Sequence, residues 1–570
     1  MNTMTKKALS GLVFVLAITV FSTAAFAGIL KHPYMIYPGQ NTQMQILWQD
    51  NASEATNVLS WGPDTTYSMG TVTVPEYGSA NQHAYTIAGL TPNTKYYYQV
   101  ADQTNGLYGA GSFITAPDNS VTAIRFLGMG DSRSQPFALD NLMQAMKSFY
   151  SQPGNEDYQR LVIHNGDWVS TDGESYWTSQ WFDPTKIDVV AFTANTPING
   201  CKGNHDNSGS YPNGKSTYFP KYFPFPYQNA TPVFDPATVQ AYNNLYWSFD
   251  YGPVHFTVVD NYSNLAAGSA QYNWVVNDLA STTKPWKIMI YHEPAYSAGS
   301  DGDNSNVRVL EPLVTQYGVD LIYCGHSHNY ARTGAYTLAQ ANGDQIALNV
   351  PHITSGGGGA PVYQPDMTNA GSYPHVITAW PAFEFMTFDV EGKTLTMTSY
   401  QVNNVSTTAI QSAATLTLSP IETIVLNHFT NVSPQVSATS TGFLYSRATK
   451  LYAGNLTITN NGPDLTGNVH VVLDGILNLQ GIGNADNQYS TTTPKLTSKI
   501  ANKPATGKGS SDPGLIANVT LVNATGSNNG EPMIQVSANG LASGASITVP
   551  LQFSNPANAT ITFNPVVLQE

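Results

Sequence analysis

The chain of 570 residues is too long to fold around one hydrophobic core, and its length predicts three or four domains. Its formal net charge of −14, with no basic block to offset it, argues against a general binder of nucleic acid or of anionic membranes. Only 11% of the residues are charged, whereas tyrosine (33 residues) and glycine (47 residues) are abundant. This composition favours short strands joined by turns over long charged helices.

Residues 1–27 have the three-part pattern of a secretory signal. Lys6 and Lys7 precede an apolar run, and the small residues Ala25 and Ala27 follow it. The pattern predicts cleavage after Ala27 and a secreted, extracytoplasmic protein. No later apolar run is long enough to span a bilayer, so we expect no membrane span after cleavage.

Residues 28–117 predict a small β-sandwich. Apolar and polar residues alternate over short runs such as "TQMQILWQD" and "TKYYYQVAD", with turn residues between them. The stretch "LTPNTKYYYQV", with Leu90, Tyr96 and Val100, resembles the tyrosine-corner strand of fibronectin type III sandwiches. We therefore expect a fibronectin type III-like N-terminal domain.

Residues 120–405 have a different sequence pattern. Apolar strands end in polar loops that contain glycine, as in "IRFLGMGDSR", "RLVIHNGDW" and "DLIYCGHSH". Helical patterns such as "PFALDNLMQAMKSFY" and "AQYNWVVNDLA" lie between the strands. Strands that alternate with helices predict an α/β domain in which loops at the strand ends carry the functional site.

The helical patterns end at about residue 406. Short β runs such as "NLTITNNG", "NVHVVLD" and "SITVPLQF" follow, separated by Asn, Gly and Pro. They predict a second, larger β-sandwich over residues 420–570. Its sequence indicates no particular role: carbohydrate binding, surface attachment and simple packing all remain open.

The chain contains two cysteines, Cys201 and Cys324, which is too few for a disulfide scaffold. Each lies in an apolar run close to a glycine. They could pair with each other, but two buried free thiols are the interpretation that we favour.

Five strand-end loops of the middle section present side chains that bind metal ions. Imidazole, carboxylate and amide oxygen together suit Zn, Mn or Fe. Two such ions about 3.5–4 Å apart are a common device for hydrolysing phosphate esters. The candidate residues are Asp131 in "GDSR", Asp167 in "GDW", Asn204 and His205 in "GNHD", His292 in "YHEP", and His326 and His328 in "GHSH".

The order GD, GD, GNHD, H, GHxH resembles that of the calcineurin-like metallophosphoesterases. The preceding sandwich, and stretches such as "GHSHNYART" and "ITSGGGGAP", make the chain similar to the purple acid phosphatase branch. The resemblance covers residues 28–400 and implies a four-layer α/β catalytic domain between the two sandwiches. It implies nothing about the C-terminal part.

The resemblance also implies a role for each motif residue, with two divalent metal ions (Mn, Zn or Fe) as cofactors. Asp167 would bridge both ions, and Asn204, His292 and His326 would complete the second. His205 would contact the phosphate and protonate the leaving oxygen. The first ion would be held by Asp131, Asp167 and His328.

The first of these two sites departs from the family pattern. Ser170 stands where the purple enzymes have a tyrosine ligand, and Arg133 stands where other branches have a histidine. We therefore expect weaker binding of the first ion and none of the colour that an iron phenolate gives. Arg133 could bind a substrate phosphate, turn to solvent or pair with a nearby acid. The additional substrate histidines of the family are also absent, and "SAGSDGDNSN" (297–306) stands in their place.

Together these features predict a secreted, metal-dependent phosphoric-ester hydrolase, similar to acid phosphatases, that acts on a small phosphate ester. A phosphodiesterase or nucleotidase of the same fold is one alternative. The incomplete first site motivates another, a non-catalytic extracellular binding or surface protein. The candidate catalytic residues His205 and Asp167 favour an enzyme, because a binding protein needs no catalytic histidine at position 205.

Overall fold

The structure is a computed structural model. It describes residues 28–51, 57–77, 81–102, 106–209, 211–228, 242–300, 302–334, 336–339, 345–348, 350–366, 376–474, 496–497, 519–528, 531–556 and 561–570. The predicted signal segment, residues 1–27, lies outside the described residues.

The N-terminal part consists of two antiparallel sheets packed face to face. Trp48 and Tyr98 are fully buried between them, and the Tyr96 hydroxyl accepts a hydrogen bond of 3.0 Å from the backbone N–H of Thr91. This bond ties strand β6 (Lys95–Asp102) to the turn before it, as expected for a tyrosine corner. One sheet has the order β1 (Ile29–Ile36), β2 (Met44–Asp50), β5 (Gln82–Ile87), and the other has β4 (Gly70–Thr73), β3 (Asn57–Gly62), β6 (Lys95–Asp102), β7 (Gly106–Ile114).

The central part contains two larger sheets. The six-stranded sheet has the order β10 (Ile198–Gly200), β9 (Val162–His164), β8 (Ala123–Met129), β20 (Glu384–Glu391), β21 (Thr394–Asn403), β22 (Thr417–Asn427). The seven-stranded sheet has the order β11 (Trp247–Tyr251), β12 (Val254–Val258), β13 (Trp286–Ile290), β14 (Leu321–Cys324), β18 (His352–Ser355), β15 (Tyr330–Thr333), β19 (Val376–Trp380). A separate pair is β16 (Tyr336–Ala339) with β17 (Gln345–Leu348).

The two large sheets pack against each other through aromatic side chains. The ring of Phe126 on β8 stacks on Phe388 of β20 at 4.5 Å between centroids and meets Phe256 of β12 edge-on at 5.4 Å. Burying such rings supplies much of the driving force for folding, at about 25 cal/mol per Å² of apolar surface. A second core lies on the far face of the seven-stranded sheet, beneath helices α5 (Ala270–Ser281) and α6 (Glu311–Tyr317).

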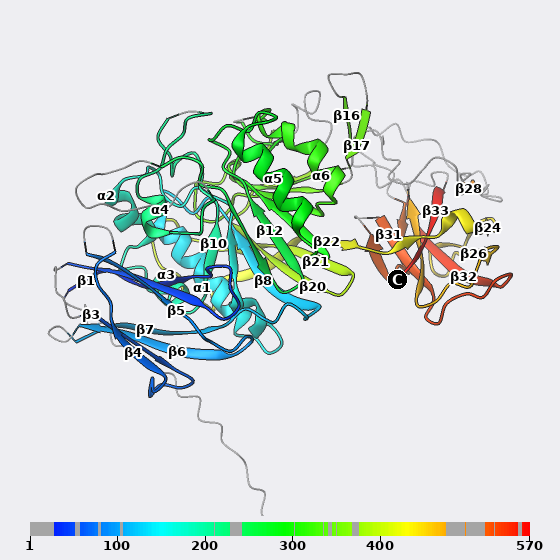
Figure 1. Cartoon of the computed structure of the whole chain (residues 1–570). Coiled ribbons are helices and arrows are strands. Elements are labelled where there is room, and N and C mark those ends of the chain that lie inside the picture. The colour runs from blue at the N-terminus through cyan, green and yellow to red at the C-terminus, as the bar shows by residue number, and fades with distance from the viewer. Residues whose placement is uncertain are drawn as a thin grey trace, which may run out of the picture.

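Helices cover the outer faces and complete the four layers (Figure 1). Helix α1 begins at Pro136, which fits the first turn because its missing N–H is not needed there. Helix α5 follows Ser269, whose hydroxyl accepts a hydrogen bond from the Tyr272 N–H. The helices are α1 (Pro136–Tyr150), α2 (Glu174–Tyr176), α3 (Ile187–Thr193), α4 (Phe219–Tyr222), α5 (Ala270–Ser281) and α6 (Glu311–Tyr317), with further helical turns η1 (Glu156–Arg160), η2 (Trp177–Trp181), η3 (Val307–Leu310) and η5 (Ser433–Gln435).

The carboxyl ends of the parallel strands meet at one edge of this double sheet. Strands β8, β9 and β10 are parallel to one another in the first sheet, and β12, β13, β14 and β18 are parallel in the second. Loops that follow neighbouring parallel strands converge on that edge, where the sites of α/β proteins commonly lie.

The C-terminal part forms two further antiparallel sheets with their own core. Figure 1 shows this part at the opposite end of the molecule from the N-terminal sandwich. Strand β22 pairs with β21 from Thr417 to Asn427, so the central sheet reaches Asn427. The C-terminal strands are β23 (Thr430–Asn431), β24 (Val436–Ser440), β25 (Leu444–Tyr445), β26 (Tyr452–Asn460), β27 (Val469–Asp474), β28 (Leu496–Thr497), β29 (Thr520–Leu521), β30 (Gly526–Asn528), β31 (Glu531–Ser537), β32 (Ser546–Ser554) and β33 (Thr562–Gln569).

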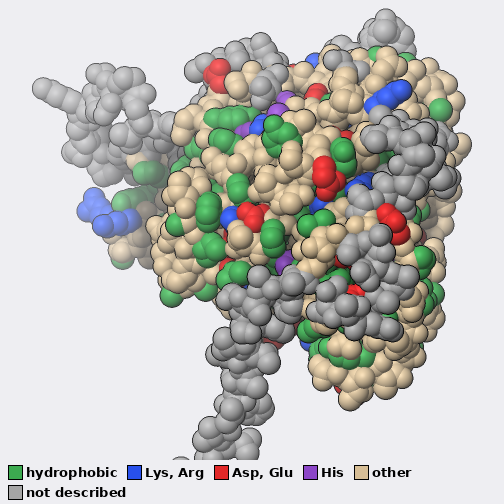
Figure 2. All heavy atoms as spheres, turned by 90° about the vertical axis from the view of Figure 1, so that its left-hand side faces the viewer, with side chains coloured by type: hydrophobic (Ala, Val, Ile, Leu, Met, Phe, Trp, Pro, Cys, Tyr) green, Lys and Arg blue, Asp and Glu red, His purple; other side chains and the backbone are tan. Residues whose placement is uncertain are grey.

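The predicted fold class is therefore confirmed: two sandwiches flank a four-layer α/β domain. Cys201 and Cys324 are buried and do not form a disulfide, which agrees with the favoured interpretation. In the described ranges, every helix is too short or too polar to cross a membrane. On the face drawn in Figure 2, charged side chains of the described residues are scattered among uncharged ones.

Candidate metal centre

The loops that carry the predicted ligands are strained where they turn. Asp131, Asp167 and His326 have φ values of 54°, 58° and 68°, in the left-handed region that side chains with a Cβ seldom adopt. Such conformations cost on the order of 1–3 kcal/mol each and persist where the surrounding structure enforces them. Here each one directs a ligand side chain inward from the end of β8, β9 or β14.

The glycines beside the ligands allow these loops to approach closely. A Cβ at Gly203 would lie 2.1 Å from Oδ1 of Asp167, and one at Gly325 would lie 2.4 Å from Oδ2 of Asp131. Both distances are far below van der Waals contact, so any side chain there would push the ligand away. The recurring glycine in the sequence pattern thus has a steric cause.

The four ligands predicted for the second ion converge. Oδ1 of Asn204 lies 3.1 Å from Nε2 of His292 and 3.1 Å from Nδ1 of His326. Nε2 of His292 also lies 3.2 Å from Oδ1 of Asp167. Atoms bound to one ion at about 2.0–2.2 Å lie roughly 3.0–3.4 Å apart, so these four atoms fit around a divalent cation.

A backbone carbonyl on the side away from the centre fixes the orientation of the His292 ring. Its Nδ1–H donates to the carbonyl of Asn165 at 2.9 Å, which directs Nε2 at the centre. Burial alone would lower the pKa of His292, but the carboxylates of Asp167 and Asp131 outweigh that effect and raise it to about 10. The two carboxylates thus favour a positive charge at Nε2, where a metal cation would take the place of the proton.

Two of the residues predicted for the first ion, Asp131 and Asp167, lie together with His292 of the second set. Ligand atoms of these three residues all lie within 4.8 Å of one another, and all three residues are buried. Oδ2 of Asp131 accepts a hydrogen bond from the His326 N–H at 2.9 Å. Its Oδ1 has no hydrogen-bond partner among the described residues and lies 3.6 Å from Nε2 of His328.

Arg133 lies among these first-site residues. Its Nε–H donates to Oδ2 of Asp167 at 2.9 Å, and its Nη2 lies 3.1 Å from Nε2 of His328. Burial, and then the charge of Arg133, lower the pKa of His328 to about 4, so this imidazole is neutral at pH 7. Of the three predicted possibilities for Arg133, pairing with a nearby acid is the one observed.

His205 lies beside Asp167 and is half-buried. Its backbone N–H donates to Oδ1 of Asp167 at 2.9 Å. Its Nδ1–H donates to the carbonyl of Ser170 at 2.7 Å, since a carbonyl can only accept. This bond fixes the ring and leaves Nε2 to exchange a proton with a ligand.

Several supporting residues were not identified from the sequence. Nδ2 of Asn165 donates to the carbonyls of Cys324 and Ser355, which joins the β9 loop to the second sheet. The carboxylate of Asp206 accepts hydrogen bonds from the N–H groups of Trp168 and Gly203, which joins the loop of Asp167 to the loop of Asn204. Asn165 directly precedes the "GD" of Asp167, and Asp206 is the last letter of "GNHD". Both side chains are fully buried, which the sequence does not reveal.

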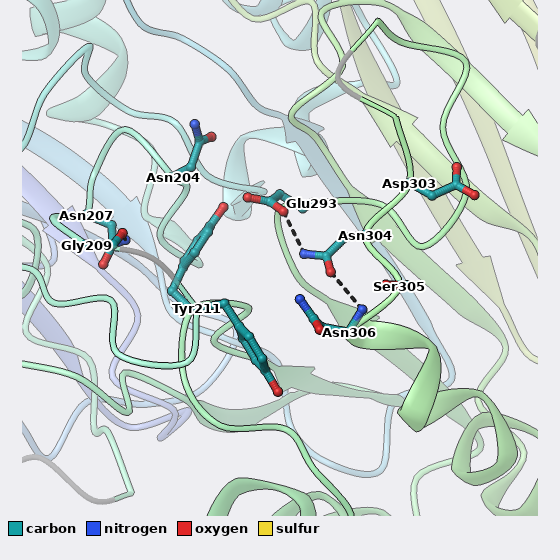
Figure 3. Close-up of a pocket in the computed structure, with 10 residues that line it drawn as sticks. Asn204, Asn207, Gly209, Tyr211, Glu293, Asp303, Asn304, Ser305 and Asn306 are labelled. Carbon is teal, nitrogen blue, oxygen red and sulfur yellow. Dashed lines mark hydrogen bonds between the residues drawn. The ribbon is translucent and has the colours of Figure 1, made fainter.

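A pocket of about 370 Å³ opens next to the second ligand set. Figure 3 shows its walls: amide side chains surround the opening, with the ring of Tyr211 and the carboxylate of Glu293 among them. Asp303 also lines the pocket but forms an ion pair with Arg308. The four amides are Asn204, Asn207, Asn304 and Asn306.

Comparison with known proteins identifies two of the three parts. The model of the calcineurin-like phosphoesterase family matches residues 124–330. A second model, the N-terminal domain of purple acid phosphatases, matches residues 31–115. The resemblance inferred from the motifs is confirmed: the middle of the chain is a calcineurin-like phosphoesterase domain, preceded by a purple acid phosphatase N-terminal domain.

The chain is similar to plant purple acid phosphatases. It is 29% identical over 265 residues to purple acid phosphatase 21 of Arabidopsis thaliana, which covers 45% of this chain and 54% of that protein. It is 28% identical over 309 residues to probable inactive purple acid phosphatase 1 of the same plant, which covers 49% of each. The chain thus spans about half the length of these curated relatives.

Two solved structures share the fold. Purple acid phosphatase PPD1 from yellow lupin (Lupinus luteus) seeds aligns with a TM-score of 0.50 and 18% identity over 70% of this chain and 74% of that one. PhoD aligns with a TM-score of 0.52 and 13% identity, over 71% of this chain and 91% of that one. At these identities the likeness concerns the fold alone.

Proposed function

We propose that this chain is a secreted, metal-dependent hydrolase of small phosphate esters. The observation that carries the proposal is the convergence of the second ligand set, Asp167, Asn204, His292 and His326, around a space suited to one divalent ion. His205 and Arg133 lie beside it with hydrogen-bonding groups available to a phosphate.

Each residue has a distinct task in this proposal. A bound divalent ion supplies the Lewis acid that polarises the phosphate and activates water. Asn165 and Asp206 hold the ligand loops in position, so little reorganisation is needed when substrate binds. His205 holds a proton at Nε2 and delivers it to the leaving oxygen, because its Nδ1–H is already engaged with Ser170. Arg133 offers N–H donors to a phosphate oxygen.

The binuclear mechanism implied by the family resemblance requires an ion in the first site as well. Asp131, with one buried oxygen that lacks a partner among the described residues, supports this expectation. Arg133, which bonds to the other two ligands, opposes it. The non-catalytic alternative also draws on this departure, and one relative of similar length is named as probably inactive.

Hydrolysis of p-nitrophenyl phosphate and of its bis-ester, with Mn, Zn or Fe added, tests the proposal. We expect metal-dependent turnover that the Asp167→Asn variant loses. Asp64→Asn is the matched control, because Asp64 is exposed in the N-terminal domain and its side chain bonds only to Thr66 among the described residues. Preference for the bis-ester would favour the phosphodiesterase alternative. Bound metal without turnover of either ester would favour the binding protein.

A further inference from the structure

The guanidinium of Arg133 engages atoms that a first metal ion would need. The Nδ1–H of His328 donates to the carbonyl of Pro361 at 2.8 Å, so the ring's lone pair is on Nε2. That lone pair accepts the Arg133 Nη2–H at 3.1 Å. Oδ2 of Asp167 accepts the Arg133 Nε–H at 2.9 Å. Two of the three ligands assigned to the first ion are thus occupied by one side chain.

A network of hydrogen bonds fixes the position of Arg133. Its Nη1 donates to the Ser134 hydroxyl at 3.2 Å, and that hydroxyl lies 2.9 Å from the hydroxyl of Ser170. Oε1 of Gln180 accepts hydrogen bonds from the backbone N–H groups of Ser134 and Ser170. The arginine side chain is only 19% exposed, so holding it elsewhere would break several bonds at once.

The positive charge of Arg133 also opposes the binding of a metal ion in the first site. A guanidinium stays protonated at every relevant pH, and a divalent ion bound to the same atoms would be repelled by it at close range. Three of the five N–H groups of Arg133 have partners among the described residues. The remaining two are available to an oxyanion.

We propose that the guanidinium of Arg133 takes the place of the first metal ion, so that the centre holds one ion, at Asp167, Asn204, His292 and His326. The inference rests on the proposed function only in assuming that this second ligand set binds metal. Asp131 then acts through the hydrogen bond that it accepts from the backbone N–H of His326. Arg133 supplies the positive charge and the N–H donors that a second ion would have supplied to the phosphate.

Metal content tests the inference without relying on turnover. The full chain without its signal is loaded with excess Mn and desalted, and its Mn content is measured by elemental mass spectrometry. Electron paramagnetic resonance then shows whether bound Mn ions are spin-coupled. We expect one Mn per chain and no spin coupling. Arg133→His removes the guanidinium and supplies a ligand, so we expect two Mn per chain and a coupled signal. Arg133→Met is the matched control, with neither charge nor ligand.

The outcomes separate this inference from the proposed function. Two coupled ions in the unchanged chain would overturn the inference even if the ester assay succeeds. One ion without turnover of any ester would overturn the function and leave the inference standing. No bound ion would overturn both. Arg133→Met should also lower kcat/KM for p-nitrophenyl phosphate roughly 100-fold, as expected for loss of an oxyanion donor.

An independent observation concerns the pocket beside Asn204. Its ten lining residues include four asparagines and two carboxylates, and none is Lys, Arg or His. Glu293 accepts a hydrogen bond from Nδ2 of Asn304 at 2.6 Å and stands next to the ligand His292. Amide groups both donate and accept, so they pair well with hydroxyl groups, whereas the carboxylate disfavours a second phosphate.

From this lining we infer that the pocket receives the leaving group of the ester and selects an uncharged, hydroxylated one such as a sugar or polyol. This inference rests on the proposed function. The test compares kcat/KM for fructose 6-phosphate and for fructose 1,6-bisphosphate, which differ by one phosphate. We expect at least a tenfold preference for the monophosphate, and Glu293→Gln should reduce that preference several-fold.

Equal or better hydrolysis of the bisphosphate would overturn the pocket inference, and so would turnover of p-nitrophenyl phosphate without turnover of either sugar ester. If p-nitrophenyl phosphate is not hydrolysed either, the proposed function fails and this inference with it. Metal content of Glu293→Gln serves as the control, since the neighbouring His292 should still bind its ion.

Discussion

The ligands of the second ion and those of the first differ in what surrounds them. Around the second set, Asn204, His292 and His326 present oxygen and nitrogen atoms to one another at 3.1 Å. In the first set, the imidazole of His328 faces a guanidinium instead. The two sets share Asp167, one oxygen of which lies beside His292 while the other accepts from Arg133.

This difference teaches that one active-site edge can keep its fold while half of its chemistry changes. The backbone that presents Asp131 is as constrained as the one that presents Asp167, since both have positive φ. Around the first set, the side chains at positions 133 and 170 differ from the family pattern that the motifs imply. A guanidinium carries one positive charge and several donors, so it can replace part of what an ion does without altering the loops.

The largest contrast is expected between His292→Ala and His328→Ala. Loss of His292 removes a ligand whose orientation Asn165 fixes, so bound metal and turnover should both fall, the latter about 1,000-fold or more. Loss of His328 should leave one ion bound and lower kcat/KM roughly tenfold, because only a partner of Arg133 is removed. Metal content and kinetics measured together test this. Equal loss of metal in both variants would contradict the difference between the two sets.

His205→Asn should have the next largest effect. The variant keeps the backbone N–H that bonds to Asp167 but removes the proton at Nε2. We expect kcat to fall about 10²–10³-fold with metal content unchanged. The fall should be greater for phenyl phosphate than for p-nitrophenyl phosphate, because phenolate is the poorer leaving group and depends more on protonation. An equal fall for both esters would argue against a general-acid role.

Lys202→Met should act on stability. Nζ of Lys202 lies 3.1 Å from Oδ2 of Asp260, and both side chains are fully buried. Removing the cation leaves a buried carboxylate without its counter-charge, which typically costs about 3–5 kcal/mol. The free energy of unfolding in urea measures the loss. Lys95→Met, at an exposed position of β6, is the control and should differ little from the unchanged chain. Because Lys202 precedes the Asn204 loop, metal binding at the second set should weaken in parallel.

Much of the candidate site could be predicted from the sequence, because its ligands follow strands that are parallel and adjacent. Short motifs such as "GNHD" and "GHSH" fix both the strand end and the ligand, so the convergence of Asn204 with His326 was predictable. The placement of Arg133 could not be predicted, because it depends on hydrogen bonds of Ser134 and Gln180. Gln180 is distant in the sequence, and neither residue belongs to a recognisable motif.

The fold was predictable to a similar degree. Alternating and continuous apolar runs indicated sandwich, α/β domain and sandwich in that order. The long-range bonds that join the sheets could not be predicted, because they pair single polar residues across the chain. Arg332 and Tyr330, for example, both donate to Glu422 of β22, and nothing in the local sequence of Glu422 marks it as their partner.

The smallest expected effect is a change in the pH dependence of stability, and it concerns Glu384 behind the first ligand set. Glu384 is buried and accepts hydrogen bonds from the Ser355 hydroxyl at 2.8 Å and the Gly357 N–H at 3.2 Å. Burial raises its pKa to about 7. Between pH 4.5 and 7 the folded protein then binds more protons than the unfolded chain, so the free energy of unfolding should fall as pH rises through this window and level off above it.

Glu384→Gln removes that dependence, because the amide is neutral throughout. A shift of this size corresponds to about 3 kcal/mol between the ends of the window, and the variant loses this contribution. A smaller slope remains in the variant, because burial also raises the pKa of Asp206 to about 7 and that of Asp140 to about 6. Urea unfolding of the metal-free protein at pH 5, 6, 7 and 8 measures both slopes. An unchanged slope in Glu384→Gln would mean that the pKa of Glu384 in the folded state has its ordinary value. The hydrogen bonds from Ser355 and Gly357 would then be made to a carboxylate, and Glu384 would add a fixed negative charge behind Asp131, which would favour an ion in the first site.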